Sequence, residues 1–154
     1  MARRHVVAAI ADNGYAGRRL VVVAAFDVVN FSALVEADEE NVLAAWRGLR
    51  REIDPLIAAN GGRIFKSLGD GLLVEFSSPV AATRAALAVQ DTAAKFKPER
   101  GVRLRLRCAI HMGEVTVEGT DLLGDGINIV SRLQQHAPTG GVLVSAAVMD
   151  LISG

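Results

Sequence analysis

LVVVAAFD, residues 20–27, is an apolar run that ends on a carboxylate. Its length and its three consecutive valines predict a strand that is buried on both faces of a sheet. A second carboxylate, Asp70, lies in the glycine-flanked segment SLGDG of residues 67–71. A strand with Asp27 at its end and a hairpin with Asp70 at its turn would place two hard oxygen ligands side by side, as divalent metals require. The pair indicates metal-assisted phosphate chemistry.

Strand-like and helix-like segments alternate outward from this run. Apolar residues at helical spacing precede a Gly61-Gly62 stop, and Gly69-Asp70-Gly71 has the composition of a tight hairpin turn. Pro79 opens an alanine-rich segment, at a position that suits helix initiation. The expected strands are residues 20–26, 63–68, 72–76, 102–117 and 142–145, and the expected helices are residues 36–60, 79–96, 128–136 and a final segment after residue 145.

This order of segments predicts the fold class. Strands interleaved with helices, with a hairpin in the middle, are typical of an α+β sandwich in which helices pack on a mostly antiparallel sheet. The ferredoxin-like order βαββαβ fits the pattern. Arg103, Arg105 and Arg107 alternate with apolar residues, and we expect them on a solvated or dimer-facing side of their strand.

Composition limits the kinds of partner. Seventeen basic residues balance seventeen acidic ones in a chain of 154 residues, so no global field draws the protein to nucleic acid or to an anionic membrane. No apolar run approaches the roughly 20 residues that cross a bilayer, so we expect a cytoplasmic protein without membrane contact. Cys108 lies in an apolar stretch and is expected to be a buried thiol, and His5, His111 and His136 lack the spacing of a zinc site.

Residues 1–17 are expected to be an extension to the domain. Their apolar run closes on Asp12, and its spacing from Arg3-Arg4 repeats the spacing of Arg18-Arg19 from Asp27. The favoured interpretation is an additional strand that pairs at the sheet edge or with another subunit. The alternative makes Asp12 a second metal ligand.

Three separated motifs carry a family resemblance. FDVVNFS at residues 26–32, FKSLGDG at 65–71 and DLLGDGINIVSR at 121–132 together resemble the catalytic domain of class III nucleotidyl cyclases, most closely the bacterial adenylate cyclases. The resemblance covers residues 18–154. It implies the nucleotide cyclase fold and a head-to-tail homodimer with two composite sites at its interface, each built from both chains.

The resemblance assigns metal and phosphate contacts to one chain. It implies that Asp27, Asp70 and the carbonyl of Val28 hold two Mg²⁺ or Mn²⁺ ions per active site. Where the family usually has glycine this chain has Asn30, a residue that tolerates left-handed backbone angles. The backbone N–H groups that would bind the β- and γ-phosphates at the start of the following helix are those of Val29, Asn30, Phe31 and Ser32.

The partner subunit would supply the remaining contacts. Lys66 and Asp121 would bind the base, and adenine, with an N6 donor and an N1 acceptor, matches a carboxylate and an ammonium group. Guanine presents the reverse pattern, so ATP is expected over GTP. Asn128 would position the ribose, and Arg132 would stabilise charge on the α-phosphate in the transition state. Taken singly, each of these residues has an ordinary structural explanation, and only their joint spacing favours the functional one.

The resulting hypothesis is an adenylate cyclase that converts ATP into 3′,5′-cyclic AMP and pyrophosphate. In the family the domain continues into two further strands, one with a lysine that contacts the triphosphate, and this sequence stops before them. The alternative is therefore a cyclase-like module that dimerises and binds nucleotide with little turnover. A fused regulatory domain outside this chain is also expected. A diguanylate cyclase is disfavoured because its Gly-Gly-Asp/Glu-Glu-Phe turn is absent from the sequence.

Overall fold

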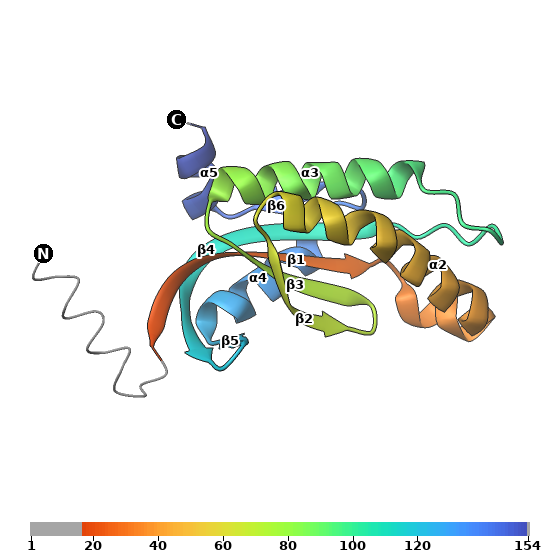
Figure 1. Cartoon of the computed structure of the whole chain (residues 1–154), viewed down its shortest axis with the longest axis horizontal. Coiled ribbons are helices and arrows are strands. Elements are labelled where there is room, and N and C mark those ends of the chain that lie inside the picture. Colours follow the sequence, from red (N-terminus) through yellow and green to blue (C-terminus); the bar gives the residue numbers. More distant parts are fainter. Residues whose placement is uncertain (1–16, 154) are drawn as a thin grey trace, which may run out of the picture.

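β1 (Arg18–Val28) runs through the centre of a six-stranded sheet in the computed structural model, which describes residues 17–153 (Figure 1). The strand order is β2-β3-β1-β4-β5, and β1 is antiparallel to both of its neighbours. β5 and β6 both pair with the outer edge of β4, at opposite ends of that strand. The strands are β2 (Arg63–Leu68), β3 (Gly71–Phe76), β4 (Leu106–Glu118), β5 (Asp121–Leu123) and β6 (Val142–Val144).

The helices complete the order that the sequence predicts. The first six elements follow the ferredoxin-like order βαββαβ, so the predicted fold class is confirmed. α4 precedes β6, and α5 follows it. The helices are α2 (Phe31–Ala59), α3 (Pro79–Lys95), α4 (Asp125–His136) and α5 (Ala146–Ile152).

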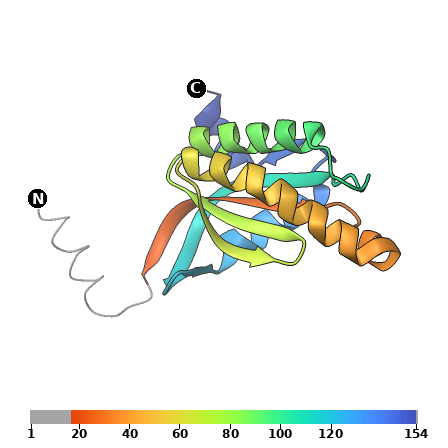
Figure 2. The ribbon, with the colours of Figure 1, turned by 45° about the vertical axis from the view of Figure 1, so that its right-hand side comes forward.

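Both faces of β1 are buried, as its unbroken apolar run predicts. Alternate residues point to opposite faces of a strand, so Val22 and Phe26 pack in the core beneath α2 and α3, whereas Val21 and Val23 pack beneath α4. Figure 2 shows α2 and α3 together on one side of the sheet and α4 on the other. By the same alternation Asp27 belongs to the α4 side, at the end of the strand.

Several boundaries differ from the sequence prediction: β1 spans residues 18–28 rather than 20–26, and α4 begins at Asp125 rather than at residue 128. α2 begins at Phe31, five residues before the apolar spacing becomes regular, and Asp38 interrupts it with non-helical angles (φ −163°, ψ 76°). β4 begins at Leu106 rather than at residue 102. Arg103 and Arg105 therefore precede the strand, and only Arg107 of the three arginines lies in it.

β5 was not expected from the sequence, because three residues are too short to show a period. It follows β4 through a two-residue turn in which Gly119 takes a left-handed conformation (φ 62°). The side chain of Leu122 is completely buried against α4, and this burial fixes β5 to the fold. Asp121 is thereby held at the outer edge of the sheet.

Several expectations about single residues can be compared with the structure. Cys108 is fully buried, which confirms the expected buried thiol, and burial raises its pKa. Within residues 17–153, no cluster of three or more His, Cys, Asp or Glu side chains is arranged to hold a metal. None of the helices in the same range has the length and apolar character that a bilayer crossing needs. The predicted strand and the Asp12 alternative lie outside the described residues.

Candidate active site

The end of β1 and the turn between β2 and β3 bring the two predicted carboxylates together. The backbone N–H of Val28 donates to the carbonyl of Asp70 at 2.9 Å, and Asp27 lies directly opposite Gly71 in the β1–β3 register. A Cβ at residue 71 would lie 2.8 Å from the carbonyl oxygen of Phe26, so the close approach of the turn requires glycine there. The local sequence thus explains why Asp27 and Asp70 become neighbours.

Asp27 lies in an electrostatically crowded position. Burial raises the pKa of its carboxyl, the guanidinium of Arg107 opposes that shift, and the Asp70 charge adds to it, with a smaller lowering contribution from Gln134. Arg107 lies opposite Asp27 on β4, with its Nε 3.8 Å from Oδ1. Both of these atoms are buried and make no hydrogen bond. The site therefore contains an unsatisfied carboxylate oxygen, which is a costly arrangement unless another charge approaches.

This donor set fits a hard divalent cation. Mg²⁺ and Mn²⁺ prefer oxygen ligands and commonly bind through one or two carboxylates, with waters and substrate phosphates completing the coordination. Asp27 and Asp70 provide two carboxylates, and the buried Oδ1 of Asp27 lacks a hydrogen-bond partner. With two carboxylates as protein ligands, the remaining coordination positions of such an ion would be filled by waters or phosphate oxygens.

The loop after β1 leads directly into α2. Asn30 takes the left-handed conformation (φ 56°, ψ 35°) and is the N-cap of α2, so the tolerance expected of asparagine is used here. The first turn of α2 contains no acidic residue, and its free N–H groups form a site that favours an anion. The N–H of Val29 donates to the carbonyl of Arg105 at 2.8 Å. Val29 thus anchors the loop to the chain before β4, so its N–H is already used, contrary to the expectation that it is free to bind phosphate.

Lys66 and Asp121 form a second group. Their Nζ and Oδ2 atoms are 3.3 Å apart, and both side chains are about one third exposed (35% and 37%), so a ligand can reach them. One lies on β2 and the other on β5, at opposite ends of the strand order. The second oxygen of Asp121 accepts a hydrogen bond from the N–H of Leu122 at 2.8 Å, which fixes the orientation of the carboxylate. The structure therefore joins two residues that are 55 positions apart in the sequence.

Asn128 and Arg132 lie on the outward face of α4. Both are exposed, while the buried face of the same helix consists of Gly126, Val130 and Gln134. A Cβ at residue 126 would lie 2.8 Å from the carbonyl oxygen of Glu114, so this glycine lets α4 pack closely on β4. Because their side chains leave the sheet, Asn128 and Arg132 face away from Asp27 of the same chain. These two residues are available to a second molecule.

The sequence analysis missed two residues near Asp27. Arg107 was assigned to a solvated or dimer-facing strand side, but its side chain is only 29% exposed and forms an ion pair with Asp27 at 3.8 Å. Gln134 is buried on α4, and its amide nitrogen lacks a hydrogen-bond partner. Only the register between β1 and β4 could have placed Arg107, and no local pattern encodes that register.

Comparison with known proteins places this chain in one family. A family model described as the adenylate and guanylate cyclase catalytic domain matches residues 18–153. A protein named adenylate cyclase from Streptomyces coelicolor is 35% identical over 148 residues, covering 94% of this chain and 37% of the relative. A Rhizobium meliloti protein provisionally named adenylate cyclase 3 is 36% identical over 145 residues, covering 89% of this chain and 24% of the relative.

Solved structures agree with the fold. The adenylate/guanylate cyclase/hydrolase from Silicibacter pomeroyi is 36% identical, with a TM-score of 0.80 over 89% of this chain and 81% of that chain. The adenylyl cyclase CyaB from P. aeruginosa is 22% identical, with a TM-score of 0.73 over 89% of this chain and 82% of that chain. This chain spans only about a quarter to a third of the length of the curated relatives it matches.

Proposed function

The chain belongs to the adenylate and guanylate cyclase catalytic domain family, and we propose that it converts ATP into 3′,5′-cyclic AMP and pyrophosphate. The observation that carries the choice of ATP is the ion pair between Lys66 and Asp121. Asp27 and Asp70, at the end of β1, support the chemistry of the reaction. We propose the same activity for any longer protein that contains this chain.

Base selection follows from the donors and acceptors of the pair. The Asp121 carboxylate accepts only, so it suits the N6 amino group of adenine, and the Lys66 ammonium donates only, so it suits N1. Guanine would set its O6 acceptor against a carboxylate and its N1–H against an ammonium group. Because these groups would be left unpaired, the site discriminates strongly against guanine. ATP is therefore the preferred substrate.

The carboxylates and the start of α2 bind the triphosphate in this proposal. Asp27 and Asp70, with the Val28 carbonyl, would hold two Mg²⁺ or Mn²⁺ ions, which when bound activate the ribose 3′-hydroxyl and neutralise charge on the phosphates. The N–H groups at Asn30, Phe31 and Ser32 would bind the β- and γ-phosphates at the helix start. Neither aspartate acts as a nucleophile.

The outward face of α4 supports a site shared by two chains. Asn128 and Arg132 are exposed and point away from the carboxylates of their own chain. In a head-to-tail homodimer they would reach the site of the partner, where Asn128 orients the ribose and Arg132 stabilises charge that develops on the α-phosphate. Lys66 and Asp121 would belong to the same chain as these two residues.

A product assay tests the proposed function. The purified chain is incubated with Mn²⁺ and either ATP or GTP, and cyclic nucleotides are separated by chromatography. We expect cyclic AMP from ATP, little cyclic GMP from GTP, and no product from Asp70→Ala. A folded, dimeric chain that forms no product would overturn the enzyme proposal and favour the nucleotide-binding regulatory module instead.

Subunit mixing tests the shared site separately. Asp27→Ala and Arg132→Ala proteins should each be inactive, because each damages both sites of its own homodimer. After random exchange at equal amounts, about a quarter of the sites should contain neither substitution and recover activity. No recovery, with exchange verified by differently tagged chains, would contradict the composite arrangement.

A further inference from the structure

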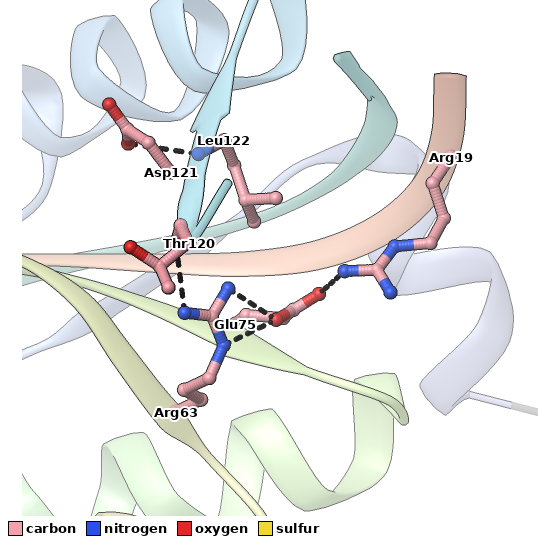
Figure 3. A network of polar contacts seen from close by, with 6 residues as sticks. All are labelled: Arg19, Arg63, Glu75, Thr120, Asp121 and Leu122. Atoms are coloured by element: carbon pink, nitrogen blue, oxygen red, sulfur yellow. Dashed lines mark hydrogen bonds and ion pairs between the residues drawn. The ribbon is translucent and has the colours of Figure 1, made fainter. Parts of the chain in front are cut away.

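A network of charged side chains lies beside the base-recognition pair (Figure 3). Arg63, the first residue of β2, donates from Nε and Nη2 to one oxygen of Glu75, at 3.0 and 2.9 Å. Arg19 donates to the other oxygen of Glu75. The Glu75 side chain is only 16% exposed, so its carboxylate is held in place between two guanidinium groups. This contact fixes the direction of the Arg63 side chain.

The third nitrogen of the Arg63 guanidinium makes a contact outside the β2–β3 hairpin. Nη1 donates at 2.9 Å to the carbonyl of Thr120, in the turn between β4 and β5. Thr120 is the residue immediately before Asp121, and Arg63 lies three residues before Lys66 on β2. One guanidinium thus bridges the two segments that supply the base-recognition pair.

β5 is otherwise held by its pairing with β4 and by the buried side chain of Leu122. It consists of three residues, pairs with β4 alone, and follows a turn that contains an exposed, left-handed glycine. Within residues 17–153, the polar side-chain contacts from β2 to this turn and strand are Arg63 with Thr120 and Lys66 with Asp121. A bound base would compete for the Lys66–Asp121 contact. The Arg63 contact uses the backbone carbonyl of Thr120 and neither side chain of the pair, so a base that binds the pair does not compete for it.

We propose that Arg63, oriented by Glu75, is a positioning residue that fixes the separation of Lys66 and Asp121 and so sets the preference for adenine. The inference rests on the proposed function of that pair. Arg63 does not touch the base. It acts through the backbone of Thr120, because a shift of that carbonyl would displace the neighbouring Asp121 carboxylate from N6.

The test compares Arg63→Ala with Arg19→Ala. Both variants remove an arginine from Glu75, but only the first removes the bond to β5, so Arg19→Ala is the matched control. For Arg63→Ala we expect KM for ATP to rise about five- to tenfold and the ATP-over-GTP ratio of kcat/KM to fall similarly, the size expected for one lost charge-assisted hydrogen bond. The kcat at saturating ATP should change less than about twofold, since the metal carboxylates are untouched.

A second, more conservative variant tests the proposal if Arg63→Ala fails to fold. Arg63→Lys keeps a positive charge opposite Glu75 but lacks the planar fork that reaches both partners, so it should raise KM in the same direction. Unchanged KM and unchanged ATP-over-GTP ratio in folded Arg63→Ala or Arg63→Lys protein would overturn the proposal. Equal effects in the Arg19→Ala control would also overturn it, because the contribution would then be general to the network.

Hydrogen exchange separates this inference from the proposed function. Backbone amides in residues 117–123 should exchange faster in Arg63→Ala than in the parent chain or in Arg19→Ala, whether or not any nucleotide is turned over. If the parent chain forms no cyclic nucleotide, the proposed function fails while the exchange still reports on the bridge. If the parent is active and the exchange is unchanged, the positioning role fails alone.

Discussion

The two groups of candidate site residues differ in how completely their charges are paired. At the carboxylate end, Asp27 Oδ1 and Arg107 Nε are buried without hydrogen bonds, and a second carboxylate lies nearby. At the base-recognition edge, Lys66 pairs with Asp121, and Arg63 pairs with both Glu75 and Thr120. The first group leaves buried polar atoms without hydrogen bonds, whereas the charged groups of the second are already paired.

This difference indicates how binding energy is distributed over the site. A buried carboxylate without a hydrogen bond gains favourable electrostatic energy when a cation binds, which favours metal and phosphate binding. The same carboxylate lowers the stability of the folded chain before binding. A pair that is held in place before binding loses little freedom when the base enters, which favours discrimination.

The largest expected effect is loss of turnover from the carboxylate end. Asp27→Ala and Asp70→Ala should each lower cyclic AMP formation by about a thousandfold or more, because metal-assisted activation of the hydroxyl is removed. Product formation by chromatography measures the effect. Asp91→Ala, which removes an exposed carboxylate that pairs with Lys95 on α3, is the matched control and should remain active. Substantial turnover by Asp70→Ala would show that the carboxylate end has been misassigned.

A smaller loss is expected from the paired edge. Asp121→Asn places both a donor and an acceptor before the base, so guanine O6 gains a partner while adenine N6 keeps one. We expect the ratio of kcat/KM for ATP over GTP to fall by about ten- to a hundredfold. Glu118→Gln, at the exposed position opposite Asp121 on β4, should leave the ratio unchanged. An unaltered ratio in Asp121→Asn would show that the Asp121 carboxylate does not take part in base selection.

The crowding at Asp27 predicts a gain in stability when its charge is removed. Because burial raises the pKa of Asp27 in the folded chain, the ionised carboxyl disfavours folding, and stability is lost as pH rises through that pKa. In EDTA at neutral pH, Asp27→Asn should raise the free energy of unfolding by up to about 1 kcal/mol in urea titrations. Mn²⁺ should stabilise the parent chain more than the variant. A destabilised variant would contradict the proposed crowding.

The smallest effect concerns His111, which is on β4 opposite Val23. Burial lowers the pKa of its imidazole, and the buried Nδ1 makes no hydrogen bond. The folded chain therefore favours the neutral ring, so the stability that this residue contributes is present above the usual histidine pKa and is lost as pH falls through it. His111→Gln should flatten the fall in stability between neutral and mildly acidic pH. His136→Gln, at an exposed position, is the control, and equal flattening there would contradict the assignment.

Sequence patterns predicted the parts of this molecule that depend on local order. The apolar run at residues 20–27 and the Gly69-Asp70-Gly71 turn predicted a strand end and a hairpin, which are local features, but the approach of Asp27 to Asp70 depends on the pairing of β1 with β3. Lys66 and Asp121 were joined only through the family resemblance. Their meeting depends on β5, which is too short to be recognised, and on the curvature of the sheet. The ion pair of Arg107 with Asp27 was not predicted, because it depends on the register between β1 and β4.

The meeting of β2 with β5 also bears on solubility. Edge strands expose unpaired backbone groups, which can recruit other chains into continuous sheets and lead to aggregation. In this fold, Arg63 and Lys66 of β2 contact residues 120 and 121 at the other end of the strand order. A strand from another molecule that approached β2 would therefore meet charged side chains and a curved sheet. Arg63 and Lys66, which are proposed to act in base selection, thus also disfavour pairing of the β2 edge with another chain.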